Sequence, residues 1–313
     1  MNLIKALKAR ELNQTMRIVL ALGGNSLLTK GQKGTAQEQR ENIAKTCKSI
    51  SRLISLGHEL VITHGNGPQI GNLLIQQELS KKEVAEMPMD VCDAMTQGQL
   101  GYLLQSELEK VSHHTIATII TQIIVDKNDP GFQHPTKPVG PFYEKQLSKD
   151  MIFDSGRGWR KIVPSPTPLE IIEIEAIKTL LKSGIIVIAA GGGGIPVTRD
   201  RKKLSGISAV IDKDRASALI GKEINADLLI IATSIDKVYL HFGTKNQKAL
   251  DSLSVSDAKK LIQKGEFAEG SMKPKIESCV NFIENGGHKA VICALEEIEL
   301  AVEGKAGTTI ERA

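Results

Sequence analysis

The sequence has 313 residues, of which 41% are hydrophobic and 24% are charged. A chain of this length can bury a core without disulfides, and this composition excludes wholesale disorder. The net charge of +4 and the aromatic content of 3% are both too low to indicate nucleic-acid binding, so we expect no nucleic-acid partner.

The cysteines and the apolar stretches bear on the compartment. No apolar stretch approaches the about 18 residues that a membrane-spanning helix needs, so we expect no membrane partner. Residues 1–15 lack the long apolar core of a secretory signal, and we interpret them as an N-terminal extension, helical or disordered. The four cysteines, Cys47, Cys92, Cys279 and Cys293, lie far apart, and no C-x-x-C pattern occurs. This spacing argues against a zinc site and against a secreted disulfide framework, so we expect a cytoplasmic location.

The first predicted elements form a strand–helix–strand unit. Residues 17–22 (RIVLAL) predict a strand. A capping box of Thr35 and Glu38 then begins a helix that should end at Gly57, and residues 59–63 predict a second strand. Two parallel strands joined by a helix are expected to have a right-handed crossover.

The alternation of predicted strands and helices continues to the end of the chain. Because the later strand candidates are apolar throughout and amphipathic helices separate them, they predict an α/β fold with a mainly parallel sheet covered on both faces. These candidates are residues 115–125, 184–190, 227–233 and 289–295.

One segment, residues 126–168, interrupts this alternation of strands and helices. It holds seven of the eleven prolines, so it cannot be a regular layer of the sheet. It also holds half of the ten aromatic residues, which favours an ordered excursion with a small core of its own. We therefore predict a protruding subdomain here.

Glycine-rich turns follow three of the predicted strands. Glycine lets backbone N–H groups approach phosphate oxygens, and ligands of open parallel sheets bind beyond the carboxyl ends of the strands. Each turn taken alone could be only a tight connection, but three at equivalent strand ends favour an anion or nucleotide site. Neither G-x-x-x-x-G-K-[ST] nor G-x-G-x-x-G occurs. The turns are Gly23-Gly24-Asn25, Gly65-Asn66-Gly67 and Gly191-Gly192-Gly193-Gly194.

Lysines stand at two predicted helix starts. Ser271 should cap a helix whose first turn carries Lys273 and Lys275, and a lysine there opposes the helix dipole unless an anion binds. The alternative is a pair of solvated charges. Lys213, between two aspartates, could likewise be a surface lysine beside a capping acid. His64, next to Gly65, is expected to support its loop, and the seven histidines show no metal-ligand spacing.

Taken together, eight ordered motifs resemble the carbamate kinases, within the amino acid kinase fold family. The resemblance runs from about residue 16 to the C-terminus. The motifs are ALGGNSLL (21–28), HGNGPQIGNLL (64–74), AMTQGQLGY (94–102), HPTKPVGPF (134–142), GRGWRKIVPSP (156–166), GGGGIPV (191–197), AVIDKD (209–214) and GSMKPK (270–275).

The resemblance implies an enzyme that reversibly transfers a phosphoryl group between ATP and carbamate, giving ADP and carbamoyl phosphate, with Mg²⁺ carried by the nucleotide. It also implies a three-layer αβα sandwich, a homodimer, and a usual direction toward ATP in arginine deiminase catabolism. An N-terminal lobe (16–190, including the subdomain 126–168) would bind carbamate, and a C-terminal lobe (191–313) would bind the nucleotide.

The resemblance also implies roles for individual residues. Lys213 and Lys275 would hold the phosphates, Asp214 would orient these lysines, and Lys137 would supply a third charge from the subdomain. Met272 would join Lys213 and Lys275 at the nucleotide. The glycine-rich turns at 23–25 and 65–67 would offer N–H groups to the transferring group and to carbamate, and the turn at 191–194 would face the junction of the acceptor and the nucleotide. No protein ligand of the metal is expected.

Three alternatives to this interpretation stay open. A kinase for another small acid, such as acetylglutamate or a phosphonate, is disfavoured because Ala21 and Leu22 stand where such kinases have a lysine just before the first Gly-Gly, and because HPTKPVG is present. A non-catalytic nucleotide-binding regulator is disfavoured by the retained lysines. A biosynthetic direction is a third alternative. Ser234-Ile235 departs from the Gly-Val that the family often has beside the adenine.

Overall fold

A computed structural model describes residues 15–23, 27, 31–154 and 158–312. The interpretation of residues 1–15 as an extension therefore falls almost wholly outside the described residues, as do Gly24 and Asn25. Among the described residues, no helix is both long and apolar enough to cross a membrane.

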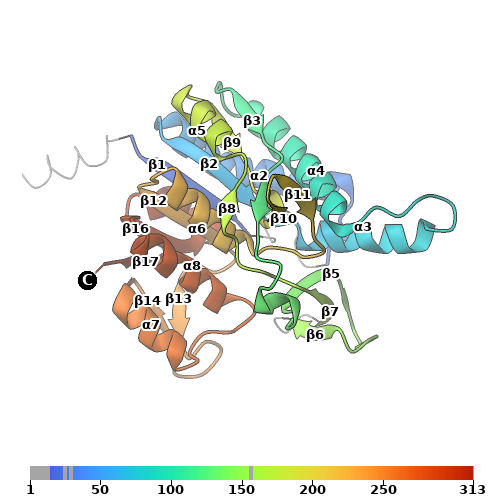
Figure 1. The fold of residues 1–313 in the computed structure, drawn as a ribbon. Helices are drawn as coiled ribbons and strands as arrows, with labels where there is room; N and C mark the ends of the chain where they lie inside the picture. Colours follow the sequence, from blue (N-terminus) through green and yellow to red (C-terminus); the bar gives the residue numbers. More distant parts are fainter. Residues whose placement is uncertain (1–14, 24–26, 28–30, 155–157, 313) are drawn as a thin grey trace, which may run out of the picture.

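An eight-stranded sheet forms the centre of the molecule (Figure 1). All neighbouring strands in it are parallel except the pair β16 and β17. The predicted mainly parallel sheet is thus confirmed. In spatial order its strands are β15 (Ser252–Ser254), β17 (Thr308–Glu311), β16 (Lys289–Ala294), β12 (Leu228–Thr233), β1 (Arg17–Leu22), β2 (Glu59–His64), β9 (Ile186–Ile188) and β3 (Ile116–Thr118).

Both faces of this sheet are buried under helices. Along β1, Ile18, Leu20 and Leu22 belong to one hydrophobic cluster, while Val19 and Ala21 belong to another on the opposite face. This alternation produces three layers, as predicted. The first cluster includes α2 (Ala36–Ser55), α4 (Met89–Glu109) and α9 (Ile298–Val302), and the second includes α5 (Ile174–Lys182), α6 (Lys213–Glu223), α7 (Val255–Gln263) and α8 (Met272–Glu284).

The helix predicted from its capping box is α2. Thr35 Oγ1 accepts a hydrogen bond from the amide of Glu38, and the Glu38 carboxylate accepts one from the amide of Thr35. Gly57, just beyond the helix, has a φ of +80°, a conformation that glycine adopts without strain. The local signals therefore fix both ends of this helix.

The single strand expected at residues 115–125 is wrong, because the chain leaves the main sheet in the middle of this run. Residues 116–118 form β3, whereas β4 (Gln122–Ile124) belongs to a second, four-stranded sheet. The amide of Thr121 donates to Gln97 Oε1 on α4 rather than to a neighbouring strand. A side chain from a distant helix thus ends β3. The second sheet also contains β8 (Glu170–Ile171), β10 (Ile195–Asp200) and β11 (Lys203–Gly206).

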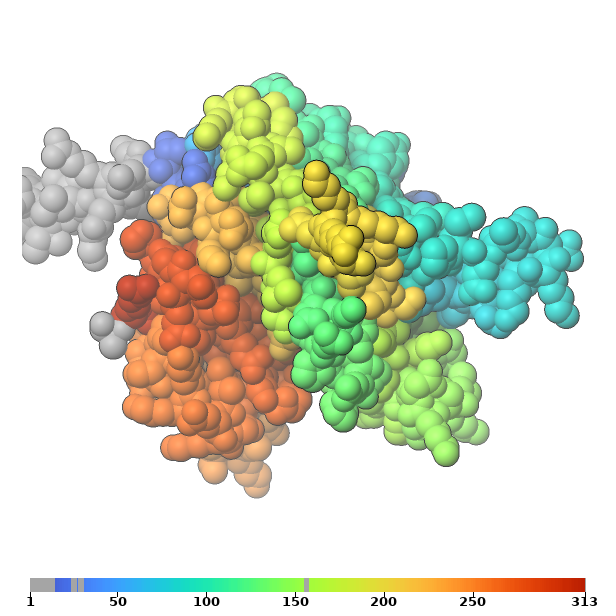
Figure 2. All heavy atoms as spheres, viewed as in Figure 1, coloured from blue at the N-terminus to red at the C-terminus, as the bar shows by residue number. Residues whose placement is uncertain are grey.

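The Pro-rich excursion contains a separate antiparallel sheet of three strands, which lies beside α3 (Gly67–Ser80) at the periphery (Figures 1 and 2). Among the described residues of the excursion, the expected small core of its own is not found: its buried Val139 and Val163 share a cluster with Ile70 and Cys92 of α3 and α4, and Phe153 is exposed. The small sheet is instead buried by packing against α3 and α4. The strands are β5 (Lys137–Tyr143), β7 (Gly158–Val163) and β6 (Met151–Asp154), preceded by the short helix η2 (Pro130–Phe132).

Two glycines let this sheet approach α3. A Cβ atom on Gly71 would lie 1.9 Å from the Cα of Gly140, and Gly140 itself has a φ of +79°. Any larger side chain at position 71 would separate the two backbones. The position of β5, and with it Lys137, therefore depends on this contact.

Candidate functional site

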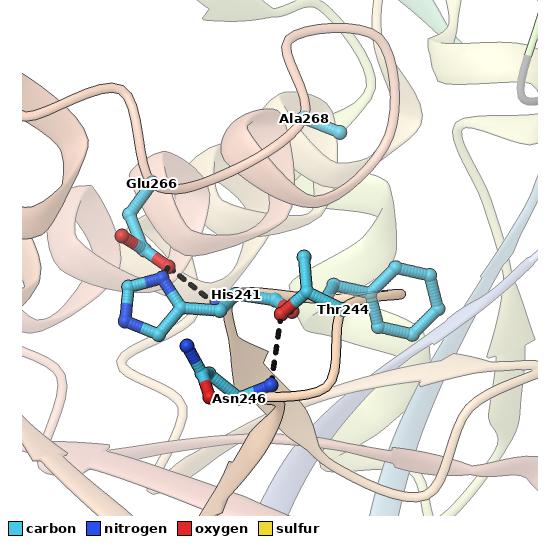
Figure 3. A pocket seen from close by; sticks show the side chains of 6 residues that line it. His241, Thr244, Asn246, Glu266 and Ala268 are labelled. Atoms are coloured by element: carbon cyan, nitrogen blue, oxygen red, sulfur yellow. Dashed lines mark hydrogen bonds and ion pairs between the residues drawn. The ribbon is translucent and has the colours of Figure 1, made fainter.

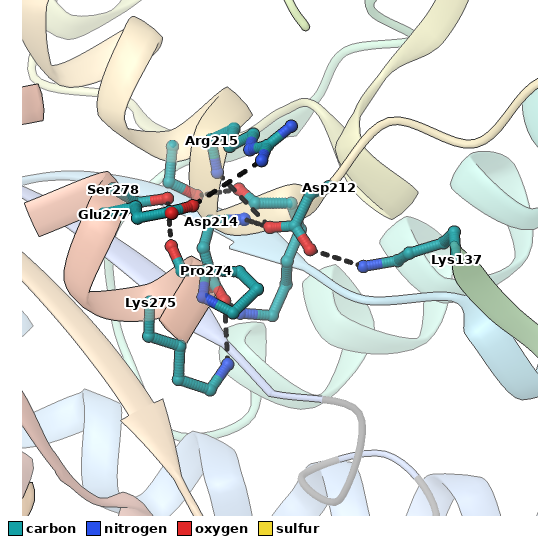
Figure 4. A network of polar contacts seen from close by, with 10 residues as sticks. Lys137, Asp212, Asp214, Arg215, Pro274, Lys275, Glu277 and Ser278 are labelled. Atoms are coloured by element: carbon teal, nitrogen blue, oxygen red, sulfur yellow. Dashed lines mark hydrogen bonds and ion pairs between the residues drawn. The ribbon is translucent and has the colours of Figure 1, made fainter. Parts of the chain in front are cut away.

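The starts of α6 and α8 bring together lysines and aspartates that the sequence separates by about sixty residues (Figure 4). Asp214 pairs with Lys213 through Oδ1 and with Lys275 Nζ through Oδ2, the latter at 2.7 Å. Lys213 is 7% exposed and Asp214 is 3% exposed. Both oxygens of one buried carboxylate are therefore engaged by ammonium groups.

Lys137 reaches the same place from β5. Its Nζ lies 2.6 Å from Asp212 Oδ2. The other oxygen, Asp212 Oδ1, accepts hydrogen bonds from the amides of Asp214 at 2.9 Å and Arg215 at 3.4 Å, so it caps the start of α6. The structure thus joins Lys137, Lys213, Asp214 and Lys275 in one network, which we call the lysine cluster, with Asp212 as its fifth member.

The charges in this cluster stabilise one another against burial. Burial alone would raise the pKa of the Asp212 carboxyl, but Lys137, then Lys275 and Lys213, hold that pKa below its usual value. Asp214 behaves likewise, because Lys213 and Lys275 outweigh its burial and lower its pKa. Burial lowers the pKa of Lys213, whereas for Lys275 the attraction of Asp214 outweighs burial and raises the pKa.

The sequence left open whether Lys273 and Lys275 belong to a site or are solvated charges, and the structure separates the two. Lys275 belongs to the lysine cluster, whereas Lys273 pairs with Glu269 at 2.9 Å outside it. Met272, the first residue of α8, is half-buried and packs against the main core. Ser271 occupies the cap position, but its side chain makes no cap hydrogen bond, so the expected capping role is wrong.

The turn after β9 is built so that only glycine fits. Gly192, Gly193 and Gly194 have φ values of +69°, +102° and +84°. A Cβ on Gly191 would lie 2.5 Å from the His64 ring, and one on Gly192 would lie 2.2 Å from the Asn66 amide. Conformation and close packing therefore both require these glycines. Their expected contact with a ligand stays a prediction.

The other glycine turns offer fewer amides than expected. The amide of Gly23 donates to Ala232 O at 3.0 Å, and that of Gly65 donates to Leu22 O at 3.2 Å. These two N–H groups extend the strand hydrogen bonding in this structure. Gly67 is the first residue of α3, and an amide at that position has no acceptor within its own helix. Of the first two turns, the described amides of Asn66 and Gly67 remain the better candidates for a ligand.

His64 lies where β2 meets the second turn. It is fully buried, and burial lowers the pKa of its imidazole to about 4, so the ring is neutral at pH 7. Its Nδ1 lies 3.2 Å from Gly65 O, and its ring fills the space beside Gly191. This placement agrees with the expected role as a support of the loop.

A cluster of buried polar side chains around Asn66 was missed by the sequence analysis. Asn66 Nδ2 donates to Asp93 Oδ1 and, at 2.8 Å, to Thr96 Oγ1, both on α4. Asp212 was considered only as a helix cap. The signal available for Asp93 and Thr96 was their place in or just before the AMTQGQLGY motif, but no local pattern says that these side chains turn toward Asn66.

A surface hollow lies beside the start of α8 (Figure 3). It has a volume of about 430 Å³. The amide of Lys273 donates to Ala268 O at 3.1 Å, which ties the hollow's rim to α8. The hollow borders the hairpin of β13 (Val238–Leu240) and β14 (Lys248–Leu250), and its lining is His241, Phe242, Thr244, Asn246, Glu266 and Ala268.

Metal-ligating side chains do not gather in the described part of the chain, where no group of three or more His, Cys, Asp or Glu residues could hold an ion. Asp212 and Asp214 are instead occupied by ammonium and amide groups. The three lysines gathered beside these carboxylates suit the site to an anionic group.

Comparison with known proteins agrees with this arrangement. A carbamate kinase from Pyrococcus horikoshii is 46% identical over 309 residues, covering 94% of this chain and 98% of the relative. One from Halobacterium salinarum is 46% identical over 300 residues, covering 93% and 97%. The structure of the Giardia lamblia carbamate kinase bound to AMP-PNP has a TM-score of 0.88 at 37% identity, covering 96% of this chain and all of that one.

The sequence model of the amino acid kinase family matches residues 16–294. This range includes β1, the glycine-rich turns and the whole lysine cluster. The chain therefore belongs to the amino acid kinase family and is a kinase, with carbamate kinases among its relatives.

Proposed function

We propose that this chain catalyses reversible phosphoryl transfer between ATP and carbamate, giving ADP and carbamoyl phosphate. The observation that carries the proposal is the lysine cluster, in which three ammonium groups converge on two carboxylates at the starts of α6 and α8. The relatives named above, all carbamate kinases, support the choice of carbamate.

The chemistry needs little beyond positioned charge. The transferring phosphoryl group spreads negative charge over its equatorial oxygens, and preorganised lysines stabilise that charge in a site with few waters. Carbamate already carries an anionic oxygen, so no general base is required. We propose that Lys213 and Lys275 hold the phosphates, and that Asp214 keeps both lysines in place before the substrates bind.

We propose that residues 191–313 bind the nucleotide and residues 16–190 bind carbamate. Lys213, Met272 and Lys275 lie at the start of α6 or α8, and the hollow lined by His241 and Phe242 adjoins α8, so it offers room for a base. The Giardia relative bound to AMP-PNP supports a nucleotide site in this fold. The turns at 23–25 and 65–67 would then face the transferring group and carbamate, and the turn at 191–194 would face the junction of the acceptor and the nucleotide.

Magnesium fits this scheme as an ion carried by the nucleotide. Both carboxylates of the cluster already have cationic or amide partners, so we assign no protein ligand to the metal. When bound, Mg²⁺ neutralises charge on the phosphate oxygens. The lysines supply the charge that belongs to the protein itself.

The subdomain 126–168 is proposed to deliver Lys137. In this structure Lys137 is held by Asp212 at the edge of the cluster, with 26% of its side chain exposed. A lysine held by a neighbouring carboxylate can move to a phosphoryl group with a small change of its side chain. We therefore propose that Lys137 contacts the transferring group as the substrates assemble.

A homodimer is proposed through α4. Val91, Met95 and Tyr102 are exposed large side chains spaced along one face of this helix, with Gly98 between them, and Ile120 is exposed beside them. Such a stripe on a helix is typical of an interface. Light scattering should report a dimer, and Tyr102→Glu should shift it toward monomer. A wild-type monomer would contradict this proposal.

The direction toward ATP is proposed from the chemistry of the substrate, while arginine deiminase catabolism is proposed from the resemblance to the carbamate kinases and the cytoplasm from the cysteine pattern. Carbamoyl phosphate is a mixed anhydride, so its phosphoryl group passes readily to ADP. The experiment that tests the function is a coupled assay of ATP formation from ADP and carbamoyl phosphate. Two alternative substrates are tested beside it: acetylglutamyl phosphate as a phosphoryl donor to ADP, and a phosphonate as a phosphoryl acceptor from ATP. An enzyme that prefers either of them to the carbamate pair would overturn the proposal.

A further inference from the structure

Helix α4 carries buried polar side chains that the proposed phosphoryl transfer does not use. One of them, Gln97, has a structural role, because its Oε1 accepts from the amide of Thr121 at 2.8 Å and its Nε2 donates to Thr121 O at 3.1 Å. Asp93 and Thr96, on the preceding turn of the helix, face a different group, the side chain of Asn66.

Asn66 occupies the cap position of α3 but does not cap it. An asparagine at this position normally accepts a hydrogen bond from a helix amide. Here Nδ2 donates instead to Asp93 Oδ1 and Thr96 Oγ1. The Thr96 hydroxyl donates to Asp93 O at 2.8 Å, so its oxygen must accept from Asn66. Both amide hydrogens of Asn66 are thereby engaged, and the orientation of its carboxamide is fixed.

This orientation leaves one polar atom of the Asn66 side chain, Oδ1, without a donor in the described part of the chain. Gly192 lies directly against the carboxamide, where a Cβ would be 2.2 Å from Nδ2 and 2.7 Å from Oδ1. An amide oxygen can accept a hydrogen bond from an N–H or O–H group but cannot donate to an oxyanion. Its ligand is therefore a hydrogen-bond donor.

We propose that Asp93 and Thr96 are positioning residues that hold Asn66 Oδ1 ready to accept a hydrogen bond from the amino group of the acceptor substrate. The inference rests on the proposed function, because the amino group is the hydrogen-bond donor of carbamate. It makes the site selective for an acyl phosphate that carries an N–H group over one of the same shape that carries a methyl group.

The charge state of Asp93 fits this positioning role. It is fully buried, its Oδ2 has no hydrogen-bond partner, and burial raises the pKa of its carboxyl well above the usual range, against the hydrogen bonds from Asn66 and Thr96. Burial thus disfavours a negative charge on the carboxyl that accepts from Asn66, next to the place proposed for an anionic substrate.

The test compares two phosphoryl donors for ATP formation from ADP: carbamoyl phosphate and acetyl phosphate, which has a methyl group in place of the amino group. Asp93→Leu and Thr96→Val each remove an acceptor from Asn66, so the ratio of kcat/KM for the two donors should fall roughly 10-fold or more. Asp93→Asn and Thr96→Ser keep an acceptor and should restore most of the ratio. Thr179→Val removes a comparable helical hydroxyl on α5, far from Asn66, and should leave the ratio unchanged.

The outcomes separate the two levels of the proposal. Thr96→Val changes neither shape nor charge, so it decides the question if Asp93→Leu fails to fold. A folded Thr96→Val enzyme with the wild-type ratio, or an equal loss with both donors, would overturn the positioning role while leaving the proposed function intact. A wild-type enzyme that makes no ATP from carbamoyl phosphate would overturn the proposed function and this inference with it.

Discussion

The molecule has two clusters of buried polar side chains, the lysine cluster and the group of Asn66, Asp93 and Thr96. The pKa of the aspartate is shifted in opposite directions in the two. Asp214 and Asp93 are both almost completely buried. The pKa of Asp214 is lowered because two lysines outweigh its burial, whereas burial raises the pKa of Asp93, whose uncharged partners Asn66 and Thr96 do not offset it. Burial alone therefore does not decide the charge of a carboxyl group; its partners do. One cluster is built to bind charge, the other to orient a neutral amide.

The largest effect is expected from Asp214→Asn, which removes the negative charge that holds Lys213 and Lys275 in the lysine cluster. Turnover should fall about 10²-fold or more, because positioned charge at the transition state is lost. The free energy of unfolding should fall by about 3 kcal/mol, since a buried ion pair loses one partner. Steady-state kinetics and urea denaturation measure the two effects.

Asp257→Asn is the matched control for this change. Asp257 also lies in the first turn of a helix, α7, but it is exposed and bonded to Ser254. It should change neither turnover nor stability appreciably. If Asp214→Asn left turnover unchanged, Asp214 would not belong to the catalytic site.

Lys137→Ala tests the connection between the lysine cluster and the subdomain. Turnover should fall about 10²-fold, because the missing charge acts mainly in the transition state. Calorimetry should show ADP binding close to that of the wild type, since Lys213 and Lys275 remain. Lys161→Ala, on β7 of the same small sheet with 60% of its side chain exposed, is the control. Normal turnover, or a defect confined to ADP binding, would remove Lys137 from the chemistry.

The sequence predicted those parts of this arrangement that depend on local patterns. The capping box of Thr35 and Glu38, the apolar strands and the glycine turns are all read from neighbouring residues. The break between β3 and β4 was not predicted, because it depends on Gln97 from a distant helix. Likewise, Lys273 and Lys275 share one helical turn, and only the position of α6 beside α8 decides that Lys275 is the one in the cluster.

The turn after β2 offers a test by pH. His64 is buried and neutral, with its pKa lowered to about 4 from 6.5. Its stabilising contribution is therefore complete above pH 6.5 and is lost as the pH falls to about 4, at roughly 1.4 kcal/mol per pH unit, or about 3 kcal/mol in all. His64→Gln should flatten the decline in stability across this window. The exposed His288→Gln should not, and a decline equally steep in His64→Gln would show that the ring is not the cause.

The smallest expected effect, from Asp93→Asn, sharpens the contrast between the two aspartates. Because folding raises the pKa of Asp93, the wild-type protein takes up a proton there, and its stability falls as the pH rises from about 4 toward the folded pKa. Asparagine does not titrate, so the melting temperature of Asp93→Asn relative to the wild type should increase between pH 4 and pH 7. The pKa of Asp214 is lowered, so its carboxylate stabilises the folded protein above about pH 4, and this stabilisation is lost as the pH falls further. Thermal melts from about pH 2 to pH 7 should therefore show opposite trends in two separate windows. The melting temperature of Asp214→Asn relative to the wild type should decrease as the pH rises to about 4, and that of Asp93→Asn should increase above that pH. If both variants shifted in the same direction, the two clusters would not differ in charge, and Asp93 would be an ionised carboxylate whose partner lies elsewhere.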